Sequence, residues 1–161
     1  MNNFSCKDTN VEDFLKNKAL DFDARNVART YLLIDEEQYL RQVIIILAYF
    51  TISLKPLVFD EKVSMNKVKQ IDGFSKHTKS VAVVLIGQLG KDTTHAPYIS
   101  GSYILELAMN IVYRISALAG CRIALLECMP IDKLLDFYKS NGFVFLQQSR
   151  DNELLQLIRF L

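Results

Sequence analysis

The stretch from Val81 to Cys128, VAVVLIGQLGKDTTHAPYISGSYILELAMNIVYRISALAGCRIALLEC, holds the pattern that decides the fold. Residues 81–89 are almost entirely apolar, which predicts a buried strand. Residues 100–119 place apolar side chains at helical spacing, and we expect Gly120 to end that helix. Residues 122–127 form a second apolar run. A strand, a helix and a strand within about 45 residues predict two nearby parallel strands with a helix on one face.

The flanking segments extend this unit into a mixed α/β sheet. Upstream, the spacing of apolar residues predicts a helix over residues 11–29 that is capped by Asn10. Further elements are expected in chain order: strands at residues 31–34 and 43–54, a loop with one short helical turn at 55–80, a helix at 131–140, and strands at 144–147 and 154–161. A chain of 161 residues fits one domain, residues 1–161.

Composition and charge limit the classes of function. Nineteen Lys and Arg against eighteen Asp and Glu give a net charge of +1, which argues against a general polyanion binder. One stretch, Lys62–Lys79, carries five lysines, His77 and a single acid, Asp72. It is either a solvated loop or a local patch that contacts phosphates.

Cysteine usage and hydropathy predict the compartment. Cys6, Cys121 and Cys128 lack the spacing of metal ligands, so we expect no metal site and a reducing environment. The N-terminal residues lack the order of a signal peptide. The longest charge-free run, Gln42–Leu54, is shorter than the ~20 residues that span a bilayer. The sequence therefore predicts a cytoplasmic protein that does not enter the membrane.

The passage from strand to helix is the most informative feature for chemistry. The helix is expected to open with Ser100, Gly101 and Ser102, after a buried strand and a polar loop. Unsatisfied backbone N–H groups and the positive end of the helix dipole together make an anion site there. The alternative is that Ser100 is simply an N-cap.

Three segments of the C-terminal half resemble one enzyme family. They are VVLIGQLGKD (83–92), RIALLEC (122–128) and DFYKSNGF (136–143), and their order and spacing match across residues 81–146. They resemble the acyl-CoA-binding region of the GCN5-related N-acetyltransferases (GNAT family). Upstream, RTYLLID (29–35) and ILAYFTISL (46–54) fit two earlier strands of the family. The first helix FLKNKAL (14–20), with RTYLL, AYFTIS and LIGQLGKD, is most similar to a branch of small stand-alone acetyltransferases that includes toxins of toxin–antitoxin pairs.

The resemblance implies a mixed, mostly antiparallel twisted sheet with a central parallel strand pair flanked by helices. It also implies acetyl-CoA as cosubstrate. The main chain of Leu89, Gly90 and Lys91 would pair with the pantetheine arm, and the small Gly90 would let the arm approach. The implied cofactor-binding residues are Leu89, Gly90, Lys91, Tyr98, Ile99, Ser100, Gly101 and Ser102. Among them, the N–H groups of residues 99–102 and the hydroxyls of Ser100 and Ser102 would hold the pyrophosphate.

The pyrophosphate loop departs from the family pattern. Where the family has Gln/Arg-x-x-Gly-x-Gly/Ala, this chain has Ala96-Pro97-Tyr98-Ile99-Ser100-Gly101, in which only the last glycine remains. Glycine lets a backbone approach phosphates, and Pro97 has no N–H to donate. This departure favours a second hypothesis, a non-catalytic acyl-CoA-binding or regulatory module. A third hypothesis is an RNA- or partner-binding domain that no longer binds the cofactor.

Two side chains are candidates for acid and base. The resemblance implies that Tyr138 protonates the departing thiolate; the alternative is a core aromatic residue beside Phe137 and Phe143, which we expect to pack. Glu127 is the candidate base, acting through water, and its alternative is a strand-end carboxylate in solvent. His77 and His95 are expected to be polar surface residues.

Substrate and partners follow from the same reasoning. An α-amine has a pKa near 8 and a lysine side chain about 10.4, and this gap of roughly 2.5 units amounts to about 3.4 kcal/mol. An α-amine is therefore the easier acceptor. The resemblance to the toxin branch implies aminoacyl-tRNA as substrate and a small antitoxin as partner. We also expect a homodimer, with Tyr49 and Phe50 as exposed aromatic residues in the substrate cleft or the interface.

Overall fold

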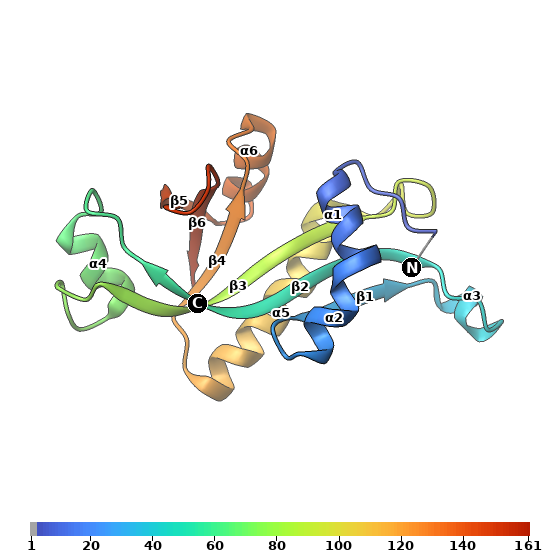
Figure 1. Cartoon of the computed structure of the whole chain (residues 1–161), viewed down its shortest axis with the longest axis horizontal. Coiled ribbons are helices and arrows are strands. Elements are labelled where there is room, and N and C mark those ends of the chain that lie inside the picture. The colour runs from blue at the N-terminus through green and yellow to red at the C-terminus, as the bar shows by residue number, and fades with distance from the viewer. Residues whose placement is uncertain (1–2) are drawn as a thin grey trace. The chain divides into compact units, whose positions relative to one another are not determined.

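The structure, a computed structural model, describes residues 3–161, and within them six strands form one mixed sheet in the order β1-β2-β3-β4-β6-β5. Figure 1 follows the chain by colour from α1 to β6. The strands are β1 (Arg29–Ile34), β2 (Ile46–Val58), β3 (Ser80–Lys91), β4 (Ile123–Cys128), β5 (Val144–Gln148) and β6 (Leu155–Phe160). The helices are α1 (Thr9–Asp13), the π-helical η1 (Phe14–Lys18), α2 (Ala19–Ala24), α3 (Glu36–Leu40), α4 (Met65–Asp72), α5 (Gly101–Ala119) and α6 (Asp132–Ser140).

The pairing of the strands confirms the predicted fold class. β3 and β4 run parallel, with α5 as the crossover between them. The pairs β1–β2, β4–β6 and β5–β6 are antiparallel. Gly120 follows α5 with φ +74°, a left-handed conformation that glycine adopts at low cost, so the predicted helix end is also confirmed.

The chain divides into two compact units. Unit 1 comprises Met1–Ser53 and Gly87–Asn110, and unit 2 comprises Leu54–Ile86 and Ile111–Leu161. Strands β2 and β3 and helix α5 contribute residues to both units. The expectation of a single domain over residues 1–161 stays a prediction.

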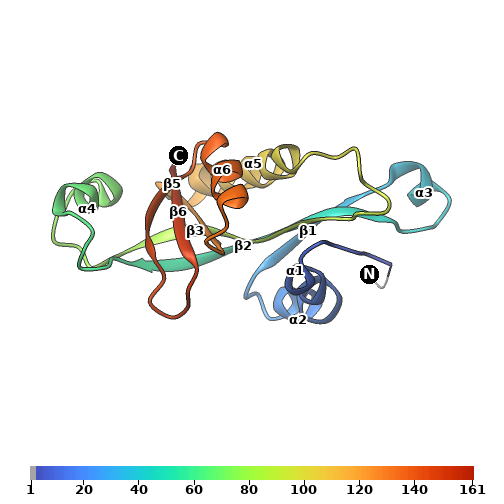
Figure 2. The same ribbon diagram turned by 90° about the horizontal axis from the view of Figure 1, so that it is seen from above.

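In unit 1, the N-terminal helices pack on β2. Leu15 and Ala19 form a buried cluster with Phe4, Ile46 and Tyr49. Figure 2 shows α1 and α2 on one side of β1 and β2, and the N-terminal part of α5 on the other. The predicted cap was wrong, because the Asp8 side chain accepts the first N–H groups of α1. The predicted single helix is interrupted by η1.

The aromatic residues of β2 are buried, which corrects the expectation that they are exposed. Tyr49 has no exposed surface and donates its hydroxyl hydrogen to the Val11 carbonyl. Phe50 is 7% exposed and stacks on Tyr31, with ring centroids 5.1 Å apart. Burial of the two rings stabilises unit 1, and the stacked pair of Phe50 and Tyr31 adds to the stabilisation that burial alone gives.

In unit 2, residues 55–80 hold more regular structure than the predicted loop with one short helical turn. Residues 55–58 continue β2, and α4 begins after the cap Ser64 and ends at Gly73 with φ +96°. Val68 and Ile71 of α4 pack into a core shared with β2, β3, β4 and β6. β2 passes through Pro56 because its registered pairing with β1 ends at Ile52, so no ladder bond to β1 is lost there.

Candidate functional site

The C-terminal part of β3 has a main-chain edge suited to strand-type pairing. The registered pairs with β4 run from Val84 to Ile86, whereas β3 continues to Lys91. On the other side, the Gln88 N–H donates to Thr51 Oγ1 and the Asp92 N–H to the Leu47 carbonyl, each at 2.8 Å. N–H directions alternate along a strand. The N–H groups of Leu89 and Lys91 therefore point to the opposite edge.

Gly90 is small for a reason that the sequence did not reveal. A Cβ atom at Gly90 would lie 2.6 Å from Val11 Cγ1 and 3.1 Å from Tyr49 Cε1, with Cys6 Sγ at 3.5 Å. The space beside Gly90 is thus filled by the chain's own N-terminal segment. This packing is a reason of its own for the glycine, and the approach of the pantetheine arm stays a prediction.

The loop after β3 is organised by a buried carboxylate. Asp92 has no exposed surface, and its oxygens accept the N–H groups of Ser5, Thr94 and His95 and contact His95 Nδ1 at 3.0 Å. Burial raises the pKa of Asp92, but the backbone hydrogen bonds from His95, Ser5 and Thr94 outweigh it, so the pKa lies below its usual value. An ionised Asp92 therefore ties the N-terminal segment to this loop.

Hydrogen bonds from Lys91, before the predicted pyrophosphate loop, and from Tyr103, after it, fix the loop. Lys91 Nζ donates to the Ile99 carbonyl at 2.7 Å and to the Pro97 carbonyl at 3.4 Å. Ser100 is the N-cap of α5, since its Oγ accepts the Tyr103 N–H at 3.1 Å. The Ile99 N–H donates to the Ala96 carbonyl at 3.2 Å, so it differs from the prediction that it faces a phosphate. Of the other predicted residues, Gly101 and Ser102 begin α5, and Tyr98 is exposed.

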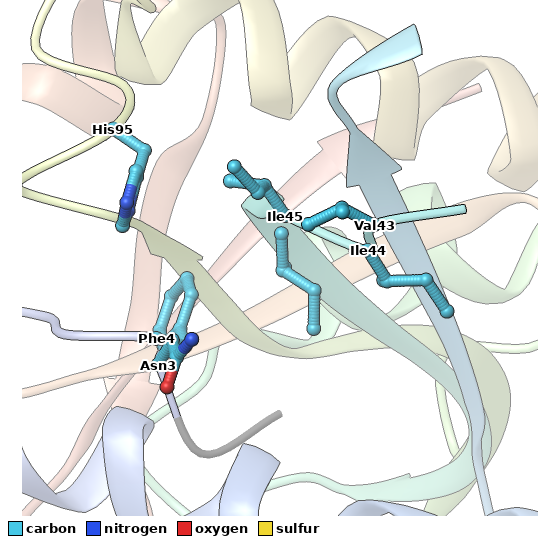
Figure 3. Close-up of a pocket in the computed structure, with 7 residues that line it drawn as sticks. Asn3, Phe4, Val43, Ile44, Ile45 and His95 are labelled. Carbon is cyan, nitrogen blue, oxygen red and sulfur yellow. The ribbon is translucent and has the colours of Figure 1, made fainter. Parts of the chain in front are cut away.

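A pocket of about 400 Å³ lies elsewhere in unit 1 (Figure 3). It is lined by Asn3, Phe4, residues 43–46 and His95. His95 is exposed, as the sequence predicted, and it also lines this pocket, with its ring Nδ1 3.0 Å from the Asp92 carboxylate. His77 is exposed, as the sequence predicted.

Tyr138 lies on α6 in unit 2 within an aromatic cluster. Its ring centroid is 5.0 Å from that of Phe137 and 6.3 Å from that of Phe143, which is buried as predicted. Burial, with a smaller contribution from Cys128, raises the pKa of Tyr138 to about 12. The phenol therefore keeps its proton throughout the neutral pH range, as a proton donor requires.

Glu127 is held in a hydrogen-bond network that the sequence did not reveal. Its Oε1 accepts from Lys55 Nζ and from Gln156 Nε2, both at 2.7 Å. The Gln156 Oε1 in turn accepts from Gln147 Nε2 at 2.7 Å. The Glu127 side chain is only 13% exposed, so the alternative of a strand-end carboxylate in solvent is wrong. The sequence predicted its place at the end of this strand, but no local signal pointed to Lys55 or Gln156.

The described residues, 3–161, contain no group of three or more His, Cys, Asp or Glu arranged to hold a metal ion. Within the same residues, no helix combines the length and apolar character needed to cross a bilayer. Leu89–Lys91 and residues 98–102 belong to unit 1, and Glu127 and Tyr138 belong to unit 2. Their roles in binding and catalysis stay predictions.

Comparison with known proteins finds likeness in the fold. No protein-family model and no curated protein sequence matches the chain. Solved structures do match: AtaT complexed with acetyl-methionyl-tRNAfMet has a TM-score of 0.73 and 23% identity, covering 97% of this chain and 85% of that one. A KacT point mutant has a TM-score of 0.73 and 22% identity, with the same coverage.

A third solved structure, AtaTR bound with acetyl-CoA, has a TM-score of 0.71 and 23% identity, and covers 97% of this chain and 84% of that one. The similarity to toxins of toxin–antitoxin pairs, implied by FLKNKAL, RTYLL, AYFTIS and LIGQLGKD, is therefore confirmed at the level of the fold.

Proposed function

We propose that the chain is an acetyl-CoA-dependent N-acetyltransferase that moves an acetyl group to a primary amine by direct attack. The observation that carries the proposal is the edge of β3, where the Leu89 and Lys91 N–H groups point away from β2 just before the loop that opens α5. Such an edge pairs with an extended arm through main-chain hydrogen bonds. The likeness to a fold solved with acetyl-CoA supports this assignment.

The chemistry proposed for the chain needs one proton donor. The amine nitrogen bonds to the acetyl carbonyl carbon, the carbon–sulfur bond breaks, and the thiolate takes the phenol proton of Tyr138. The attacking amine gives up its own proton, with Glu127 as the proposed acceptor through water. Glu127 Oε1 already accepts hydrogen bonds from Lys55 and Gln156, and no other base is proposed for the site. Such a site favours an amine of low pKa over a lysine side chain.

The proposed acceptor is the α-amine of an aminoacyl-tRNA, and the proposed role is that of a toxin with a small antitoxin partner. AtaT, which shares the fold, has been solved with acetyl-methionyl-tRNAfMet and with the C-terminus of the antitoxin AtaR. The lysines of residues 62–79, part of which forms α4, are the proposed tRNA-contacting surface. A homodimer remains part of the proposal.

One observation favours a second candidate, the non-catalytic acyl-CoA-binding or regulatory module. Pro97 has no N–H, and the Ile99 N–H already has a partner within the loop. The two candidates differ in Tyr138: a binding module has no use for its proton. Acetyl transfer that Tyr138→Phe removes, with acetyl-CoA binding retained, supports the enzyme.

The experiment that tests the proposal is calorimetric titration of the purified protein with acetyl-CoA. We expect micromolar binding, and we expect Gly101→Arg at the start of α5 to abolish it. Asn110→Arg, an exposed position on the same helix, is the matched control and should bind as the parent protein does. Absence of binding in the parent protein contradicts both the enzyme and the binding module.

A further inference from the structure

The side chain of Lys91 places a positive charge inside the loop before α5. Its Nζ lies 2.7 Å from the Ile99 carbonyl oxygen and 3.4 Å from that of Pro97. We propose that this ammonium contacts the diphosphate of acetyl-CoA and replaces the backbone donors that the loop has lost. The inference rests on the proposed function and assigns a new role to a side chain of the same site.

The loop is poor in donors for a defined reason. Pro97 has no N–H, and the Ile99 N–H is directed to the Ala96 carbonyl at 3.2 Å. The Tyr103 N–H in the first turn of α5 is taken by Ser100 Oγ. Backbone groups alone therefore give a phosphate fewer partners here than a glycine-rich loop offers.

The Lys91 ammonium has two hydrogen-bond acceptors and no carboxylate partner among the described residues. Among residues 3–161, no carboxylate forms an ion pair with it. Its neighbour Asp92 is occupied by Ser5, Thr94 and His95. An ammonium carries three protons, and the two carbonyls use two of them. One N–H and the full charge are left for an anion.

The position of this charge gives it a preference for an anionic ligand. Ile99, which accepts its shorter bond, lies two residues before the 19-residue helix α5. A cation close to the positive end of a helix dipole is electrostatically unfavourable, and a phosphate brought beside it removes that cost. Lysine binds phosphate as a point charge, so it does not need the geometry that a glycine loop provides.

The test compares three ligands that differ in their phosphates: acetyl-CoA, its dephospho form, which keeps the diphosphate, and acetyl-pantetheine, which has none. We expect Lys91→Gln to weaken binding of the first two by about tenfold and to leave the third unchanged, because one charge-assisted bond to phosphate is lost. Lys91→Arg should retain most of the affinity. Lys7→Gln, an exposed lysine in the same unit, removes an equal charge as the control.

Three results overturn the inference. They are undiminished acetyl-CoA binding in Lys91→Gln, an Arg variant as weak as the Gln variant, and a loss for acetyl-CoA that disappears with its dephospho form. The last result would assign Lys91 to the terminal phosphate of the nucleotide. Failure of the unsubstituted protein to bind acetyl-CoA at all is different, because it contradicts the proposed function and not the role of Lys91 alone.

Discussion

The Nζ atom of Lys55 lies 2.7 Å from Oε1 of Glu127, so side chains of β2 and β4 form an ion pair across β3, the strand between them. The carboxylate is mostly buried and the ammonium is about one-third exposed. The pair is therefore part of the packing of unit 2 as well as a feature of the candidate base. The two roles predict different effects of substitution.

For stability, we expect Lys55→Met and Glu127→Gln each to lower the free energy of unfolding by about 1 kcal/mol, the upper range for a partly exposed pair. The double variant should lose less than the sum, since the two residues share one interaction. Urea unfolding measures all three.

For catalysis, only Glu127→Gln should lower kcat, by about 100-fold. Equal kcat in both single variants would contradict a role as base.

Tyr138→Phe tests the proton donor. Loss of a general acid lowers kcat by about 10²–10⁴-fold. The dissociation constant for acetyl-CoA should stay the same, because the ring and its contacts with Phe137 and Phe143 remain. Tyr39→Phe, at an exposed position on α3, is the matched control. If kcat of Tyr138→Phe equals that of the parent protein, Tyr138 is not the proton donor and serves only in packing.

Asp92→Asn tests the buried carboxylate whose hydrogen bonds join the N-terminal segment to the loop before α5. We expect a loss of about 1–3 kcal/mol near neutral pH, because buried N–H groups lose a charged acceptor. The pKa of Asp92 is lowered in the folded protein, so its contribution is present above the unfolded pKa of about 3.9 and is lost as pH falls through the folded value.

The difference in stability between the parent protein and Asp92→Asn should therefore shrink as the solution is acidified. Denaturant unfolding at several pH values between neutral and acidic measures it. A difference that stays constant with pH, or grows toward acid, would show that Asp92 does not contribute through its charge.

Gly90→Ala tests the packing of β3 against the N-terminal segment. The added Cβ would lie 2.6 Å from Val11 Cγ1, so we expect a loss of about 1–3 kcal/mol from overpacking. Val11→Ala in the same chain should restore part of it by making room. If the double variant is no more stable than Gly90→Ala alone, the contact with Val11 is not the cause.

The regular elements were predictable because their signals are local. The apolar blocks of β2, β3 and β4 and the helical spacing of α5 lie in short windows, and Gly120 marks a helix end by a rule of backbone conformation. The parallel pairing of β3 and β4 followed from the crossover through α5. The candidate Tyr138 depended on a resemblance in its sequence context, not on periodicity.

The rest depended on contacts between residues distant in sequence. Nothing near Gly90 indicates that Val11 fills the space beside it, and nothing near Glu127 indicates Lys55. Burial of Tyr49 follows from the N-terminal helices that cover it. Helix α4 was underestimated because its mean hydropathy is low, although Ser64 and Gly73 are ordinary cap residues.

A transfer assay with acetyl-labelled acetyl-CoA and a mixture of aminoacyl-tRNAs tests the proposed activity directly. We expect label on the α-amine of the aminoacyl group, together with release of free CoA, in the parent protein and a loss of both in Tyr138→Phe. Binding of acetyl-CoA with no acetyl transfer to any α-amine would contradict the proposed activity, and would favour the non-catalytic acyl-CoA-binding module instead.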